Sequence, residues 1–146
     1  MSGFKYLPHR IELVKNSNDI KWFNDSKSTN VSSTIAALEY VNHNIILIMG
    51  GAKKNLDYSK LSPYIDAHAK LVILLGENSS SLADQISSQI DIKMAQTMTE
   101  AIQLASENAI ALDSVLLSPA SPSFDMYKNF EERGIAFRQA VKELVK

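Results

Sequence analysis

The sequence has 146 residues, of which 45% are hydrophobic and 21% are charged, a balance typical of one folded globular domain rather than a disordered chain. Fifteen basic and sixteen acidic residues give a net charge of −1, which excludes a chain-wide basic field for nucleic acid or an anionic membrane. The absence of cysteine excludes disulfides and thiolate chemistry, and no apolar run is long enough to cross a bilayer. Because the start of the chain also lacks the apolar core of a secretory signal, we expect a cytoplasmic protein. We also expect it to be monomeric.

The first expected element is a β-hairpin. Residues 11–14 and 20–23 are short β-prone runs, and the polar residues between them have turn chemistry. Continuous apolar runs follow, which is typical of parallel strands covered on both faces. These runs are Ile45–Met49, Leu71–Leu75, a weaker one at Ile90–Met94, and Ser114–Leu117.

Segments with helical spacing alternate with these runs. Apolar residues recur every three or four positions within 31–41, 82–90, 98–105 and 137–144. Strands that alternate with helices predict βαβ crossovers. The pattern therefore predicts an α/β domain with a mostly parallel sheet, an N-terminal hairpin and helices on both faces.

Polar or glycine-bearing loops follow three of the expected strands, at 24–30, 50–57 and 118–130. In open α/β sheets, ligands bind beyond the carboxyl ends of the strands, so we expect the site in these loops. The first loop opens a helix, whose free N–H groups attract anions. Lys27 could add a donor there and Asp25 could accept from sugar hydroxyls, although helix capping explains the same residue types.

The second loop contains Gly50 and Gly51, which allow a sharp turn close to a ligand, and Lys54, which suits a phosphate or a carboxylate. A tight turn with solvated lysines is an equally good explanation. The loop is not a G-x-x-x-x-G-K-[ST] phosphate loop, and no such motif occurs in the sequence. The third loop offers hydroxyl and N–H groups to a carboxylate, or is only a proline-stiffened connection.

Few other residues suggest chemistry. His9 and Arg10 form a cationic pair before the first strand, whereas the remaining histidines stand apart, and we expect no metal site. We interpret Trp22 as a core residue. The charge run at 128–133 is expected to be a solvated helix face, with the role of Arg133 left open.

Four separated blocks give the most specific signal. They are LPHR at 7–10, NDSKSTN at 24–30, Gly50-Gly51 with Lys54, and SPA at 118–120 followed by Ser123, Asp125, Phe130, Arg133 and Gly134. In order and spacing these blocks resemble the carboxyl-terminal domain of the Mur ligases, and most closely that of the members that add D-glutamate. The resemblance covers nearly the whole chain.

The resemblance implies that residues 1–146 form one Rossmann-like three-layer domain of a larger ATP-dependent ligase. In the family, other domains hold UDP-N-acetylmuramoyl-L-alanine and use ATP and Mg²⁺ to phosphorylate its carboxylate, which the amine of D-glutamate then attacks. The carboxyl-terminal domain holds D-glutamate and closes over ATP. We therefore expect a domain without catalytic residues of its own and inactive alone, with Met1-Ser2 as an added start.

Site residues are carried over by position. The resemblance assigns D-glutamate binding to Thr29, Lys54, Ser123 and the backbone near Phe130, and nucleotide binding to His9, Arg10, Asp25 and Lys27. Asp25 would face the ribose, and Arg10 and Lys27 the phosphates. The sequence departs from the family at Tyr6, where glycine is usual, at Tyr127, where phenylalanine is usual, and at Lys53, so either Lys53 or Lys54 could hold the substrate.

Two alternative functions stay open. The nearer is the equivalent domain of another Mur ligase or of a folylpolyglutamate synthase, but members that choose a diamino acid carry a D-N-P-R-type block where this chain has GAKKN at 51–55. The other is a stand-alone α/β binding module such as a receiver domain. That class needs an acidic cluster at the strand ends, and only Asp25 is so placed.

Overall fold

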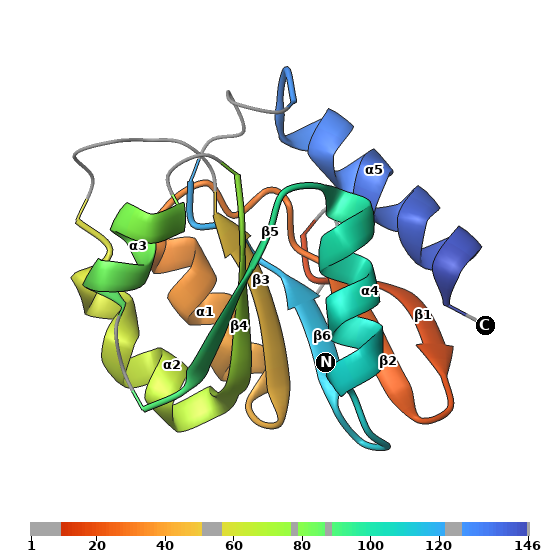
Figure 1. Cartoon of the computed structure of the whole chain (residues 1–146), viewed down its shortest axis with the longest axis horizontal. Coiled ribbons are helices and arrows are strands. Elements are labelled where there is room, and N and C mark those ends of the chain that lie inside the picture. Colours follow the sequence, from red (N-terminus) through yellow and green to blue (C-terminus); the bar gives the residue numbers. More distant parts are fainter. Residues whose placement is uncertain (1–9, 51–56, 77–78, 87–88, 122–126, 146) are drawn as a thin grey trace, which may run out of the picture.

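The computed structural model describes residues 10–50, 57–76, 79–86, 89–121 and 127–145 (Figure 1). In chain order the elements are β1 (Glu12–Ser17), β2 (Ile20–Asn24), α1 (Val31–Val41), β3 (Ile45–Gly50), the 3₁₀ turn η1 (Ser59–Leu61), α2 (Ser62–His68), β4 (Ala69–Leu75), α3 (Ser79–Gln85), β5 (Asp91–Ala95), α4 (Met98–Asn108), β6 (Ser114–Leu117) and α5 (Phe130–Leu144). None of the helices in these ranges is long and apolar enough to cross a membrane.

The strands form one sheet in the order β1-β2-β6-β3-β4-β5. β1 pairs antiparallel with β2, and every other neighbouring pair is parallel. The expected hairpin is confirmed: Asn18 and Asp19 at its tip both have positive φ, of 55° and 63°, which matches the right-handed twist of the two strands. The predicted mostly parallel α/β sheet is therefore confirmed.

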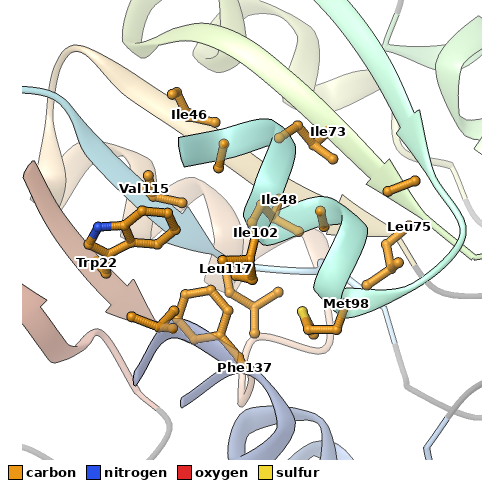
Figure 2. Close-up of a cluster of buried hydrophobic side chains, with 14 of the residues drawn as sticks. Trp22, Ile46, Ile48, Ile73, Leu75, Met98, Ile102, Val115, Leu117 and Phe137 are labelled. Carbon is orange, nitrogen blue, oxygen red and sulfur yellow. The ribbon is translucent and has the colours of Figure 1, made fainter. Parts of the chain in front are cut away.

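Helices cover both faces of the sheet, with α1, α2 and α3 on one side and α4 and α5 on the other (Figure 1). Alternate side chains of β3 point to opposite faces of the sheet, and helices cover both faces, so all six of its residues are buried. Ile46 and Ile48 pack with Trp22 and Phe137 toward α4 and α5 (Figure 2), whereas Leu47 packs toward α1 and α2. Double coverage explains why the central strands read as continuous apolar runs.

The segment between β3 and β4 was not predicted. It contains η1 and α2, which the apolar spacing of the sequence did not indicate. Pro63 lies in the first turn of α2, where its missing N–H removes no helical hydrogen bond. Leu61 and Ile65 supply the buried face of this short segment. The segment has so few apolar positions that a helical period cannot be recognised in its sequence.

Gly50, at the end of β3, is required by its surroundings. Its φ of +131° is a conformation that side chains rarely adopt. A Cβ atom there would lie 2.2 Å from the backbone oxygen of Leu75, on the neighbouring strand. The glycine therefore lets β3 and β4 remain paired to the edge of the sheet where the polar loops begin.

We expect the substitution Gly50→Ala to lower the free energy of unfolding by about 2–4 kcal/mol, because it adds backbone strain to a collision with backbone atoms that cannot rotate away. Urea unfolding measures this. The neighbouring Met49→Leu, a volume-conserving change in the core, should cost less than about 1.5 kcal/mol. Equal losses in the two variants would contradict the role given to Gly50.

Candidate functional site

The described parts of the three loops converge at one edge of the sheet, because β2, β6 and β3 are neighbours whose carboxyl ends lie together. Backbone hydrogen bonds join the segments: the Asp25 amide donates to the Leu117 oxygen at 2.8 Å and the Ala120 amide to the Ser28 oxygen at 3.0 Å. The Gly50 amide donates to the Pro119 oxygen at 3.3 Å. The described residues that follow these strands therefore form a single connected surface.

Asp25 lies at the centre of this surface and is 1% exposed. Its Oδ1 accepts from the Ile11 amide at 3.2 Å, and its Oδ2 accepts from the Ser118 hydroxyl at 2.8 Å and from the Ser28 hydroxyl. Burial raises the pKa of the Asp25 carboxyl to about 6, while these hydrogen bonds and the charge of Arg10 act in the opposite direction. Asp25 therefore connects the residue before β1, the 24–30 loop and the residue after β6.

A pocket of about 110 Å³ opens beside this carboxyl. Arg10, Ile11, Asp25 and Ser28 line one part of it, and Ser33 and Ala36 of α1 line the rest. Arg10 is exposed, so its guanidinium can move to meet an anion. Two residues assigned to the nucleotide, Arg10 and Asp25, thus share one pocket.

Lys27 and Phe130 also lie together, although 103 positions separate them in the chain. The Lys27 ammonium nitrogen stands 5.9 Å from the centre of the Phe130 ring, within the range of a cation–π contact. Thr29 is half-buried and lies just before Asn30, whose side chain caps α1 by accepting from the Ser33 amide at 2.9 Å. The loop therefore presents Lys27 and Thr29 while Asn30 supplies the cap.

Three assigned residues lie outside the described residues. They are His9, Lys54 and Ser123. Their assignments, and the choice between Lys53 and Lys54, stay predictions. Within the described ranges no group of three histidine or carboxylate side chains could hold a metal ion.

Arg133, whose role the sequence left open, is not part of a solvated helix face. It is 3% exposed and lies on the first turn of α5, pointing into the loops. Its Nε donates to the Ser26 hydroxyl at 2.9 Å, and its terminal nitrogens donate to the Ser26 and Ser121 backbone oxygens at 2.9 and 3.0 Å. Burial is tolerated because the guanidinium donors are paired.

Sequence reasoning also missed the small hydroxyl residues that connect the loops. The Ser118 hydroxyl lies 3.0 Å from that of Thr34, and Ser121 donates to the Gly50 oxygen at 2.8 Å. Ser26 donates to the Phe130 oxygen at 2.7 Å. The three serines follow strands that end in a buried run, which is a sequence signal that could have identified them, whereas Thr34 lies within α1.

Asp25 makes stability depend on pH. The pKa of Asp25 is higher in the folded chain than the ordinary value of 3.8, so the folded state binds the proton more tightly than the unfolded state. The stability that this bound proton contributes is lost as the pH rises through about 6. We expect the wild type to lose about 1 kcal/mol more than Asp25→Asn between pH 5 and 7.5. Urea unfolding at both pH values measures this, and parallel pH profiles would contradict the buried, proton-binding carboxyl.

The sequence is similar to those of several curated proteins. Proteins from Nitrosococcus oceani and Salinibacter ruber are 44% and 42% identical to this chain, and each alignment covers 99% of this chain but 32% of the relative. Both carry the name UDP-N-acetylmuramoylalanine--D-glutamate ligase. The chain thus spans about a third of the length of the curated relatives it matches.

Among solved structures, the bifunctional folylpolyglutamate synthase/dihydrofolate synthase of Yersinia pestis, complexed with AMPPNP and a Mn ion, shares the fold. Its TM-score is 0.61 at 13% identity, and the match covers 95% of this chain and 32% of that one. The family model described as "Mur ligase, glutamate ligase domain" matches residues 9–121, which include the first loop, the pocket residues and the end of β6. On this evidence the chain belongs to the Mur ligase, glutamate ligase domain family.

Proposed function

We propose that this chain is the amino-acid-binding domain of an ATP-dependent ligase that joins D-glutamate to UDP-N-acetylmuramoyl-L-alanine, a cytoplasmic step in the synthesis of peptidoglycan precursors. The observation that carries the proposal is the 44% identity, over nearly the whole chain, to a relative named for that reaction. We assign only binding and orientation of substrates to these residues. Residues 1–146 act as one domain, and the sugar nucleotide is bound elsewhere in the enzyme.

The nucleotide half of the site consists of Arg10, Asp25 and Lys27, with His9 next to Arg10 in the chain. Arg10 and Asp25 line the same pocket, which supports a ligand that carries both phosphates and hydroxyl groups. The two cations would bind the phosphates, and the carboxylate would accept from a ribose hydroxyl. The related Yersinia structure holds AMPPNP and a Mn ion. ATP brings Mg²⁺ on its phosphates, and we assign that ion no ligand among the described residues.

The amino-acid half consists of Thr29, Lys54, Ser123 and the backbone near Phe130. A dicarboxylate that enters a closing cleft needs a cation and several donors, because an unpaired buried charge is costly. Hydrogen bonds to the charged carboxylates, each worth about 1.5–3 kcal/mol, would fix the orientation of D-glutamate. Its amine would then be aimed at the acyl phosphate as the domain closes.

The fold alone does not choose between this reaction and that of a folylpolyglutamate synthase. The Yersinia enzyme has a similar fold, but at 13% identity the likeness says nothing about the substrate. The relatives at 42–44% identity favour D-glutamate, and so does the GAKKN segment in place of the arginine-bearing block of diamino-acid ligases.

Amino-acid binding can be tested by titrating the ¹⁵N-labelled chain with D-glutamate, L-glutamate, lysine and meso-diaminopimelate. We expect D-glutamate to bind best and to shift the amides of Thr29 and Phe130. Thr29→Val removes one hydroxyl donor to a carboxylate and should weaken D-glutamate binding about tenfold or more. Thr99→Val, on the exposed start of α4, is the matched control and should leave the affinity unchanged. Preference for lysine or meso-diaminopimelate would overturn the substrate.

Nucleotide binding is tested separately by titration with ADP. Lys27→Met should weaken ADP binding about fivefold, less than a buried charge pair would, because the lysine is only half-buried. Lys93→Met, an exposed lysine on the edge strand β5, controls for the loss of charge. We also expect no ATP hydrolysis or ligation by the chain alone, because it contains no phosphate loop. Ligation by the purified chain, or equal effects of the two lysine variants, would contradict these assignments.

A further inference from the structure

We propose that Arg133 is a positioning residue that holds the nucleotide half and the amino-acid half of the site in one fixed arrangement. This inference rests on the proposed function, because it explains how the two sets of binding residues keep their relative positions. We assign Arg133 itself to neither substrate, because its guanidinium nitrogens donate to Ser26 and Ser121 and, unlike Asp25, it does not line the pocket beside Arg10.

The contacts of Arg133 reach both halves. Two of its donors hold Ser26, through the hydroxyl and the backbone oxygen, each at 2.9 Å. Ser26 stands between Asp25 and Lys27, the two nucleotide residues of the first loop. Arg133 is therefore bonded to the residue that lies directly between these two nucleotide residues.

A third donor holds the loop after β6. It reaches the Ser121 backbone oxygen at 3.0 Å, and the Ser121 hydroxyl in turn donates to the Gly50 oxygen at 2.8 Å. The guanidinium thus also joins the end of β3 and the loop after β6 to the first loop, which carries Thr29 of the amino-acid half.

The start of α5 completes the connection. The Ser26 hydroxyl that accepts from Arg133 also donates to the Phe130 backbone oxygen at 2.7 Å. The ring of Phe130 faces the ammonium of Lys27. Helix α5 therefore holds the first loop by its backbone, by a side-chain hydrogen bond and by a ring contact, and Arg133 lies at the centre of these interactions.

Arginine suits this position for a physical reason. Its planar guanidinium presents donors in fixed directions, so one side chain can bond to two loops at once. A lysine carries the same charge on a single nitrogen and cannot span the positions of Ser26 and Ser121 in the same way. An apolar residue of similar length would leave the Ser26 and Ser121 oxygens buried without this partner.

The test uses Arg133→Met and Arg133→Lys in this chain, with Lys142→Met as the control for the loss of a cation. Lys142 lies in the last turn of the same helix and is exposed. Hydrogen exchange is followed at the amides of Ser28 and Ala120, with Val72 and Leu74 of β4 as internal references. Affinities for D-glutamate and ADP are measured well below the unfolding temperature of each variant, so that only folded protein is compared.

We expect Arg133→Met to speed exchange at Ser28 and Ala120 about tenfold relative to β4 and to weaken both ligands about tenfold, the loss of roughly one charged hydrogen bond. Arg133→Lys should recover part of both losses, and Lys142→Met should change neither. Unchanged affinities, or exchange that rises equally in β4 and in the loops, would overturn the inference. If the wild type binds neither ligand, the proposed function fails, and the exchange result alone decides whether Arg133 holds the loops together.

Discussion

Polar loops that are nevertheless buried impose the main constraint on this structure. Where β2 and β6 end, most of the described residues that follow stay buried, so their polar groups must bond to one another rather than to water. Asp25 and Arg133 satisfy most of this demand, one as an acceptor for several donors and the other as a donor to several acceptors. Their networks connect segments that are about a hundred residues apart in the sequence, and the candidate site lies on this connected surface.

The sheet supplies the platform for these loops. Its central strands are buried on both faces, so they cannot shift without exposing one of two apolar clusters. Trp22 shows how closely the platform and the loops are linked: it packs in the core, yet it lies only three residues before Asp25 (Figure 2). Because the binding residues follow the strands so closely, the packed sheet fixes their positions. Fixed positions are needed to orient a reacting amine.

Much of the fold and part of the candidate site could be predicted from residue patterns, and the features that were missed have physical causes. Apolar runs revealed β3, β4 and β6, because strands covered by helices on both faces are apolar at nearly every position. Helix α2 escaped notice because it offers few apolar positions. The loops were found from their glycines and polar residues, but the burial of Arg133 was not, since a charge on a polar helix normally faces water. Long-range partners such as Ser26 and Ser121 cannot be read from local sequence.

If this chain binds a small dicarboxylate where β2, β3 and β6 end, a crystal structure of the chain with D-glutamate will show it there. We expect the amino acid to lie beside Thr29 and the start of α5, with at least one carboxylate bonded to a lysine of the loop that follows Gly50. An amino acid bound at the opposite edge of the sheet, in the pocket lined by Asn16, His43 and Leu112, would contradict it.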